Sequence, residues 1–196
     1  MTAPRIGVLG GTFDPIHHGH LAAASEVCAA LGLDRVLLVP TATQPFKTDE
    51  PVSSDEDRIA MLERVAAQDA RLQVSRVDVD RGGITYTLDT LTDLRAQLPD
   101  AELFFITGYD ALERFDEWKE PARLHELATF VGVSRPGHGT PDAPGPFVLV
   151  NVPALDVSST DVRRRVREGA PIRYLVPHCV ADYIVEHDLY TGGRDD

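Results

Sequence analysis

Hydrophobic residues follow two different spacings along this chain, and the two spacings alternate. Apolar stretches of strand length predict buried β-strands at Arg5–Leu9, Arg35–Val39, Leu72–Val79, Glu102–Thr107, Thr129–Ser134 and 147–150. The segments between them repeat apolar residues every three or four positions, which predicts helices at His18–Leu31, Asp57–Ala67, Thr87–Leu98, Pro121–Leu127, Ser159–Glu168 and Pro177–His187. This alternation indicates an α/β fold, with a doubly wound parallel sheet that carries helices on both faces.

Capping and breaking residues mark the ends of these elements. Ser53 or Ser54 is placed to cap the second helix, and Gly32 to end the first. Two stretches rich in Pro, Gly, Thr and Asp, at Pro40–Pro51 and Arg135–Pro146, predict loops. With 196 residues, 43% of them hydrophobic, the chain can bury a substantial core. We expect a single domain over residues 1–196 with a C-terminal helical part at about 158–190.

Charge and cysteine content exclude some classes of protein. The net charge of −12 argues against a nucleic-acid partner, because such binding depends on Lys and Arg, but it leaves room for a small phosphorylated ligand. Cys28 and Cys179 lie among apolar residues, which favours buried thiols over a disulfide. There is no apolar signal region and no run of about 18 apolar residues, so we expect no membrane association and a cytoplasmic location.

The segment Gly10–His20, GGTFDPIHHGH, predicts a phosphate site. It follows a predicted strand and leads into a helix, where free amides at the helix start favour anions. Gly10 and Gly11 allow close approach of the backbone to a ligand, although two glycines alone are also typical of an ordinary turn. His17 and His20, three residues apart, are expected on one side of the helix start, whereas His18 is expected in solvent.

This segment resembles the signature (His/Thr)-x-Gly-His of a nucleotidyltransferase superfamily, which implies a Rossmann-like fold. In that superfamily the two histidines hold ATP phosphates and stabilise the transition state. The resemblance implies that the first part of an ATP site consists of Gly10, Gly11, Thr12, Phe13, His17, Gly19 and His20. The signature indicates the reaction type and leaves the acceptor open.

Two later segments resemble the remaining nucleotide motifs of the superfamily. Val157–Arg163 resembles its Ile-Ser-x-x-x-x-Arg motif, and hydroxyls and amides at a helix start suit phosphate. Gly108 and Asp110 match a Gly-x-Asp whose carboxylate lies near the ribose, although Asp110 could instead cap a helix. The resemblance implies that these segments contribute Gly108, Asp110, Ser158, Ser159, Thr160 and Arg163, while Arg164, Arg165 and Arg167 are interpreted as a solvated face.

Further motifs resemble the nicotinate-nucleotide adenylyltransferase family, in order along nearly the whole chain. Thr85-Tyr86-Thr87 with Thr90 resembles its Ser-Tyr-Thr-x-x-Thr block, and Phe115 with Trp118 resembles its Phe-x-x-Trp. In the family the tryptophan stacks on the pyridine ring, although a lone Trp is equally typical of a packing anchor. The resemblance implies that nicotinate mononucleotide is bound by Thr12, Asp14, Lys47, Thr87, Trp118, Lys119 and Arg135, with Lys119 acting through its amide. Phe46 departs from the family, which commonly has His there.

The resemblance implies transfer of AMP from ATP to nicotinate mononucleotide, giving deamido-NAD and pyrophosphate in NAD biosynthesis. His17, His20 and Arg163 would be the catalytic residues, by positioning and charge stabilisation. We expect Mg²⁺ to arrive with ATP, since no carboxylate cluster suggests a metal cage. Alternatives are another acceptor, such as nicotinamide mononucleotide or pantetheine phosphate, and a nucleotide-binding sensor without catalysis. A homo-oligomer is compatible with the sequence.

Overall fold

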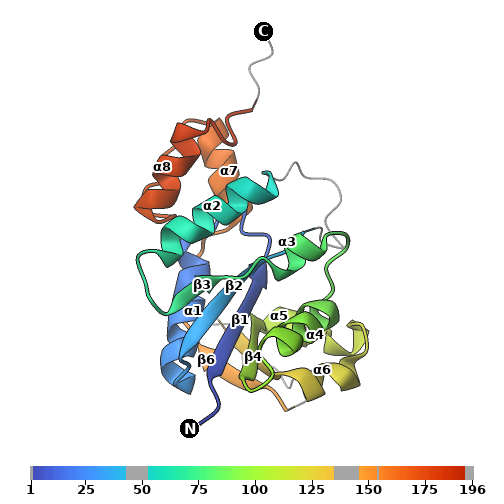
Figure 1. Ribbon diagram of the computed structural model, residues 1–196. Coiled ribbons are helices and arrows are strands. Elements are labelled where there is room, and N and C mark those ends of the chain that lie inside the picture. The colour runs from blue at the N-terminus through green and yellow to red at the C-terminus, as the bar shows by residue number, and fades with distance from the viewer. Residues whose placement is uncertain (1, 43–52, 135–145, 154, 193–196) are drawn as a thin grey trace.

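The computed structural model describes residues 2–42, 53–134, 146–153 and 155–192. Its centre is a six-stranded sheet in the order β3-β2-β1-β4-β5-β6, and all five pairings are parallel (Figure 1). The strands are β1 (Arg5–Gly11), β2 (Arg35–Pro40), β3 (Leu72–Val74), β4 (Glu102–Gly108), β5 (Thr129–Ser134) and β6 (Val148–Asn151). This order, with parallel strands throughout, is that of a doubly wound Rossmann-like sheet and confirms the predicted fold class.

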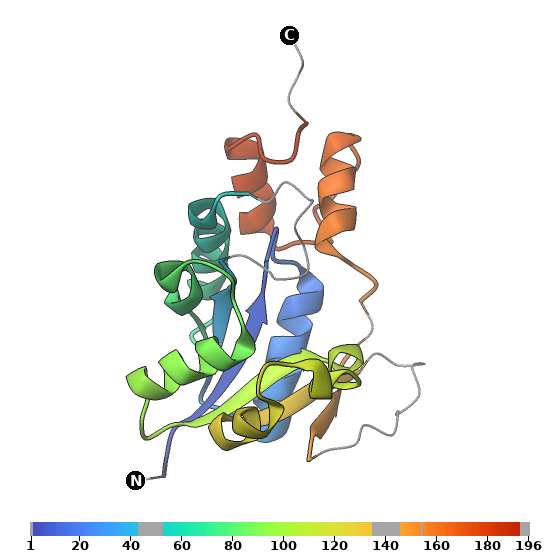
Figure 2. The same cartoon turned by 90° about the vertical axis from the view of Figure 1, so that its right-hand side faces the viewer.

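Helices cover both faces of the sheet, as the alternating pattern predicted (Figure 2). They are α1 (His18–Leu31), α2 (Asp55–Ala66), α3 (Val77–Arg81), α4 (Thr87–Gln97), α5 (Tyr109–Leu112), a 3₁₀ turn η1 (Phe115–Glu117), α6 (Pro121–Leu127), α7 (Ser159–Arg167) and α8 (His178–Glu186). Ser54 caps α2 by accepting a hydrogen bond from the Asp57 amide, and Gly32 ends α1 in the left-handed conformation, both as predicted.

Each face of the sheet has its own apolar core. On one face α1, α2, α7 and α8 pack against Leu9, Val36, Leu38 and neighbouring strand residues. On the other face α3, α4, α6 and η1 cover Ile6, Val8 and their neighbours. Successive residues of β1 therefore face opposite cores, which explains why its sequence is continuously apolar rather than alternating. A substitution in β1 therefore disturbs the core on one face of the sheet, and which face depends on whether the position along the strand is odd or even.

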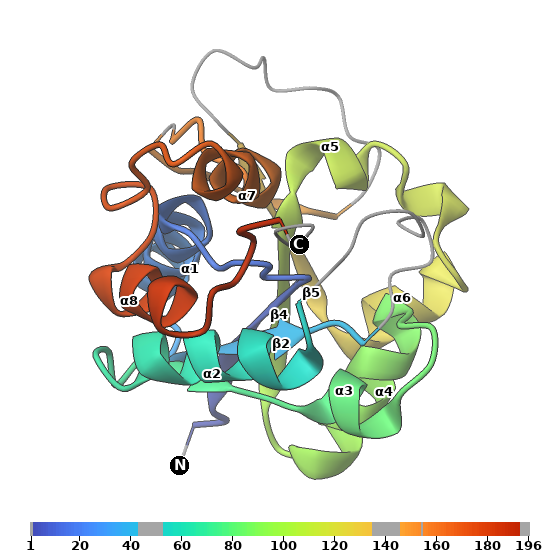
Figure 3. The ribbon, with the colours of Figure 1, turned by 90° about the horizontal axis from the view of Figure 1, so that it is seen from above.

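Strands are added to one side of β1 up to β3 and to its other side from β4 onward, and this switch point indicates where the site lies. β1 pairs with β2 on one side and with β4 on the other. In open α/β sheets, ligands bind outside the carboxyl ends of the strands at such a switch point. Seen from above in Figure 3, α2, α5, α7 and α8 lie around this end of the sheet.

One predicted strand is wrong over half its length. The expected strand Leu72–Val79 ends at Val74, and Val77–Arg81 forms α3 instead. The alternation of valine with aspartate looked like a strand, but Asp78 is buried and accepts hydrogen bonds from Arg81, one turn later, and from Thr90 of α4. These contacts require a helical turn, so tertiary contacts override the local pattern.

Other local differences are small. Pro40 lies inside β2 rather than after it, Pro177 precedes α8 as its N-cap, and α5 and η1 were not predicted. Cys28 and Cys179 are free thiols; Cys28 is buried as expected, whereas Cys179 is only half-buried, and desolvation raises the pKa of each. Among the described residues, no helix has the length and apolar character needed to cross a membrane.

Candidate active site

The segment after β1 forms a tight loop that presents the first motif. Gly11, the last residue of β1, lies close against this loop, and a side-chain carbon on it would be 3.1 Å from the Phe13 ring. Phe13 itself has a positive φ of 52°, a conformation that costs a non-glycine residue free energy, and its ring is fully buried. The following Asp14–Pro15 peptide bond is cis. The loop is thus held in an uncommon shape by packing of Phe13 from within.

The two histidines of the motif are brought together as predicted. His17 is the N-cap of α1 and His20 lies in its first turn, and their rings stack with centroids 3.6 Å apart and an angle of 20°. The Phe13 ring meets His20 edge-on at 5.1 Å. Gly19 leaves room for this stack, since a side-chain carbon there would lie 3.1 Å from the His17 ring. His18, expected in solvent, is half-buried.

The protonation state of His20 follows from its surroundings. Its Nδ1 accepts a hydrogen bond from the His17 amide at 3.3 Å. Burial, and secondly the neighbouring His17, lower the pKa of His20 from 6.5 to about 3. The ring is therefore neutral at pH 7, and because Nδ1 accepts, Nε2 carries the proton. His20 presents a neutral N–H donor, suited to an anionic oxygen.

The second predicted motif lies directly against the first. Ser158 caps α7 by accepting from the Asp161 amide, and the Ser159 hydroxyl donates to the Pro15 carbonyl at 2.8 Å. The Arg163 guanidinium donates to the Asp14 carbonyl at 2.7 Å and is only 9% exposed. Two helix starts, those of α1 and α7, are thus fixed to one loop. Both favour bound anions through their free amides.

Asp14 occupies a different place from the one expected of a substrate-contacting residue. Its side chain is 1% exposed. Its Oδ1 accepts from the Ser53 hydroxyl and from the Tyr190 hydroxyl, each at 2.6 Å, and from the Ser53 amide at 3.3 Å. In this structure the carboxylate faces the protein interior and joins three chain segments, rather than lining the mononucleotide site. The buried position follows from long-range contacts that the motif alone does not reveal.

Arg58 also supports the loop and was missed by the sequence reasoning. It lies on α2 with its side chain 1% exposed, and its guanidinium donates to the carbonyls of Thr12 at 2.7 Å and Thr41 at 2.8 Å. It also pairs with Asp55 at 2.5 Å. Only its position, next to the apolar Ile59 within a helix, distinguished it from a solvated arginine. A charged side chain is rarely buried unless it is paired, so this clamp is a strong structural element.

The predicted acceptor block lies at the start of α4, on the other side of the sheet end. Tyr86 is its N-cap residue and Thr87 its first residue. The Thr85 hydroxyl accepts from the Ala42 amide at 3.2 Å, which links the block to the end of β2. The Lys119 ammonium pairs with Asp89 at 3.1 Å and lies 4.8 Å from the centre of the Tyr86 ring. Two predicted acceptor elements, residues 85–90 and Lys119, are therefore in contact.

Trp118 is both near this block and part of a core. Its ring is half-buried and packs against Phe115 at 5.3 Å, Phe130 at 5.9 Å and Phe105 at 6.1 Å. The structure thus confirms that Trp118 packs against an aromatic core. The ring is only partly buried, and the next residue, Lys119, contacts the predicted acceptor block.

Asp78 of α3 holds the start of α4, and with it the predicted acceptor block, through hydrogen bonds. It is 1% exposed, and the Thr90 hydroxyl donates to both its oxygens at 2.8 and 2.9 Å. Arg81 donates to the same carboxylate at 2.6 Å and to Asp93 at 2.6 Å. The network ties α3 to α4 and so holds the connection that contains Thr85 to Thr87.

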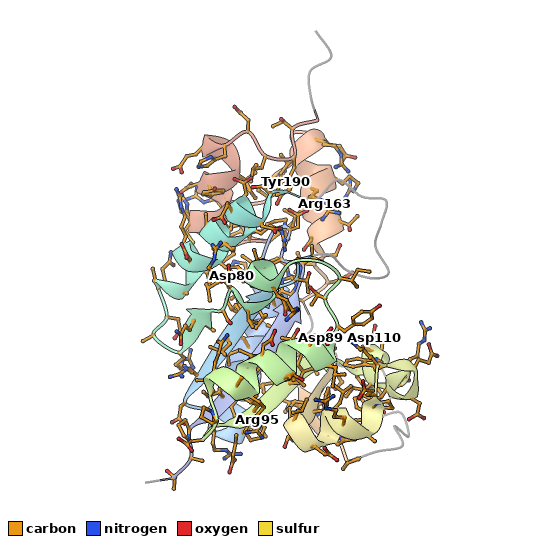
Figure 4. The ribbon with its side chains drawn as sticks, turned by 45° about the vertical axis from the view of Figure 1, so that its right-hand side comes forward. Asp80, Asp89, Arg95, Asp110, Arg163 and Tyr190 are labelled. Carbon is orange, nitrogen blue, oxygen red and sulfur yellow. The ribbon has the colours of Figure 1, made fainter. Side chains whose placement is uncertain are left out.

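The remaining predicted residues divide into two groups. Gly108 is the N-cap of α5, and Asp110 lies exposed in its first turn, so the capping role considered for Asp110 is not observed. A side-chain carbon on Gly108 would overlap the Asp110 carboxylate unless that exposed side chain moved. Figure 4 shows Asp110 on α5 and Asp89 on α4, both toward the side of the molecule where the acceptor block lies. Lys47, Arg135 and Phe46 lie outside the described residues.

Two helix starts at a sheet switch point, with an N–H-donating histidine and a buried arginine, are typical of an anion-binding site in a doubly wound sheet. The family model described as Cytidylyltransferase-like matches residues 8–165. The chain belongs to this family of nucleotidyltransferases, and the matched region includes most of the site described above.

Sequence relatives narrow the family further. A protein of Saccharopolyspora erythraea, described as a probable nicotinate-nucleotide adenylyltransferase, is 55% identical over 194 residues, covering 97% of this chain and 92% of the relative. A Streptomyces coelicolor protein with the same description is 54% identical, covering 94% of this chain and 100% of the relative. The chain therefore belongs to the family of nicotinate-nucleotide adenylyltransferases.

Solved structures support the fold. The Plasmodium falciparum nicotinic acid mononucleotide adenylyltransferase complexed with APC superimposes with a TM-score of 0.78, at 18% identity, over 95% of this chain and 97% of that one. The same enzyme complexed with NaAD also gives 0.78, at 19% identity and with the same coverage. At this identity the likeness concerns the fold alone.

Proposed function

We propose that this chain is a nicotinate-nucleotide adenylyltransferase, which transfers AMP from ATP to nicotinate mononucleotide and releases deamido-NAD and pyrophosphate. One observation carries this proposal. His17, His20 and Arg163 converge on one loop at the sheet switch point, within a chain that shares over half its residues with members of that family. The enzyme is a nucleotidyltransferase of NAD biosynthesis.

The reaction requires positioning more than acid–base chemistry. A phosphate oxygen of the mononucleotide attacks the α-phosphorus of ATP in line. The new P–O bond forms as the bond from the α-phosphorus to the bridging oxygen breaks, and the electron pair leaves with pyrophosphate. Because the nucleophile is already an anion, no general base is needed, and catalysis rests on alignment and on stabilising the developing charge.

We assign the charge-stabilising roles to the three converging residues. Neutral His20 donates from Nε2 to a phosphate oxygen, and His17 supports it by stacking. Arg163 supplies the cation. The proposed ATP site consists of these three residues with Gly10, Gly11, Thr12, Phe13, Gly19, Gly108, Asp110, Ser158, Ser159 and Thr160.

The acceptor side of the proposal rests on the contact between Lys119 and the block at the start of α4. Thr87 and the Lys119 amide would bind the nicotinate carboxylate, and Trp118 would cover the pyridine ring. Thr12, Lys47 and Arg135 complete the proposed mononucleotide site. Asp14 contributes to it by fixing the loop backbone, because its carboxylate is buried.

The metal enters as part of the substrate, MgATP. The described residues contain no group of three or more His, Cys, Asp or Glu arranged to hold a metal ion. We propose that the cation is bound by phosphate oxygens and water, with the protein supplying donors around the phosphates. A cytoplasmic location and a homo-oligomeric state stay predictions from the sequence.

Pyrophosphate release tests the proposal directly. The protein is incubated with MgATP and nicotinate mononucleotide, and in parallel with nicotinamide mononucleotide or pantetheine phosphate. We expect release with the nicotinate form, greatly reduced with the amide, because a site built for a carboxylate leaves polar groups unpaired when the amide binds. The His20→Asn variant, checked by its melting curve, serves as the inactive control.

Each other outcome removes a part of the proposal. Equal release with both pyridine nucleotides would reject the carboxylate-reading role of Thr87 and Lys119. Release with pantetheine phosphate alone would assign another acceptor. Binding of MgATP without release for any acceptor would favour a nucleotide-binding sensor.

A further inference from the structure

The last part of the chain returns to the active site after α8. Figure 3 shows this segment crossing from α8 toward the centre of the sheet end, and Figure 4 shows Tyr190 close to Arg163 there. The Tyr190 hydroxyl donates to Asp14 Oδ1 at 2.6 Å, across 176 residues of sequence. The phosphate motifs do not include this tyrosine. It nevertheless contacts Asp14, which lies between Gly11 and His17 in the sequence.

The backbone on both sides of this contact is strained. Asp188 has a φ of 51°, Tyr190 of 63° and Phe13 of 52°, all in the left-handed region that non-glycine residues rarely adopt. Such conformations persist only where surrounding contacts fix them. The Tyr190–Asp14 hydrogen bond joins two such segments, and Ser53 contacts both side chains.

Asp14 transmits this contact to the catalytic residues. Its main-chain carbonyl accepts from Arg163 at 2.7 Å, and its Oδ2 lies 3.7 Å from the same guanidinium. Phe13, directly before it, packs against His20. A shift of the Asp14 side chain therefore moves the backbone that Arg163 holds and the ring that borders His20.

The Tyr190 hydroxyl is held as a donor. Burial, and secondly the Asp14 charge, raise the pKa of Tyr190 well above its usual range. The proton therefore stays on the tyrosine oxygen at any pH at which the enzyme works. A strong O–H···O⁻ bond of this length is also directional, which suits a positioning role.

We propose that Tyr190 is a positioning residue for nucleotidyl transfer, which acts through Asp14 on Arg163 and on the loop that carries His17 and His20. This rests on the proposed function. Misplacement of reacting groups by about 1 Å costs on the order of a hundredfold in rate, so loss of one positioning contact is expected to reduce kcat by roughly tenfold or more.

Tyr190→Phe tests this by removing one oxygen and keeping the ring. Tyr183→Phe is the matched control, because Tyr183 also donates to an aspartate, Asp57 at 2.9 Å, in a contact between α8 and α2 that does not involve Asp14. Both variants lose a tyrosine–aspartate hydrogen bond, so their melting temperatures should fall by similar amounts. Only Tyr190→Phe should lose kcat, with the KM values for MgATP and the acceptor changed less than twofold.

A double-mutant cycle with Asp14→Asn tests whether Tyr190 acts through the Asp14 carboxylate. If Tyr190 acts through the carboxylate, Tyr190→Phe lowers kcat in the parent enzyme and leaves it unchanged in the Asp14→Asn background. Additive losses would overturn the route through Asp14. Full kcat in Tyr190→Phe, measured well below the melting temperature, would reduce Tyr190 to a stabilising contact and overturn the proposal.

The same experiment separates this inference from the proposed function. Wild-type enzyme is first assayed with each acceptor. Lack of turnover with nicotinate mononucleotide would refute the proposed acceptor, while Tyr190→Phe is still compared with wild type on whichever acceptor reacts. An effect on that acceptor supports the positioning role, and none refutes it.

Discussion

Replacing Arg58 by methionine should destabilise the protein more than any surface substitution on α2. The guanidinium makes two buried charge-assisted bonds, to the Thr12 and Thr41 carbonyls, each worth about 1.5–3 kcal/mol. The pair with Asp55 adds little, because that carboxylate is 44% exposed and screened by solvent. Methionine recovers some packing, so we expect a loss of about 3–5 kcal/mol.

That loss is large compared with a typical total stability of about 5–15 kcal/mol. Urea denaturation followed by circular dichroism measures it as a shift of the midpoint at constant slope. Arg64→Met is the control on the same helix, because Arg64 forms an exposed pair with Glu186 and should cost at most about 1 kcal/mol.

A loss for Arg58→Met no larger than that for Arg64→Met would refute the reasoning. It would mean that water or a backbone shift satisfies the two carbonyls as well as the guanidinium does. With the expected loss, MgATP should stabilise the Arg58→Met variant less than the parent, since Thr12 belongs to the proposed ATP site.

Three further predictions concern single side chains. Stability should fall as the pH drops below about 6.5, since unfolded His20 takes up a proton that the folded protein excludes down to about pH 3; His20→Asn should remove up to about 1.4 kcal/mol per pH unit of that slope in urea titrations. Thr90→Val should raise KM for the mononucleotide at least threefold and leave KM for ATP unchanged, whereas Thr92→Val, which loses only a bond to its own helix, should change neither. Trp118→Ala should raise KM for the mononucleotide by roughly tenfold, whereas Trp118→Phe should restore most of it; equal values for all three proteins would remove the ring from the site.

The fold could be predicted well where the signals are local. Gly32 and Ser54 mark helix ends by their own conformational preferences, and β1 and β4 are apolar enough to indicate strands buried on both faces. Val77–Arg81 was misjudged because its helical turn depends on a carboxylate that is satisfied by a residue of the next helix. Local patterning does not contain that information.

The site shows the same division. His17, His20 and Arg163 were predicted from a family resemblance that helix starts and phosphate chemistry support, and the structure brings them to one loop. Their roles stay predictions. Arg58 and Tyr190 were missed as functional residues, since each reaches the loop from a distant segment and neither belongs to a phosphate motif. The burial of Asp14 has the same cause, because its partners arrive from positions 53, 163 and 190.

The strand order also determines how this chain folds as it is synthesised. β1 can pair with β2 early, but its other edge pairs with β4. β4 is synthesised about 70 residues after β2, an interval of several seconds at roughly 5–20 residues per second. During that interval the unpaired N–H and C=O groups along the free edge of β1 are exposed. They can pair with a strand of a second nascent chain. A pause in translation between the two strands would lengthen this exposure, so we expect the yield of folded protein to fall when synthesis across residues 41–101 is slowed.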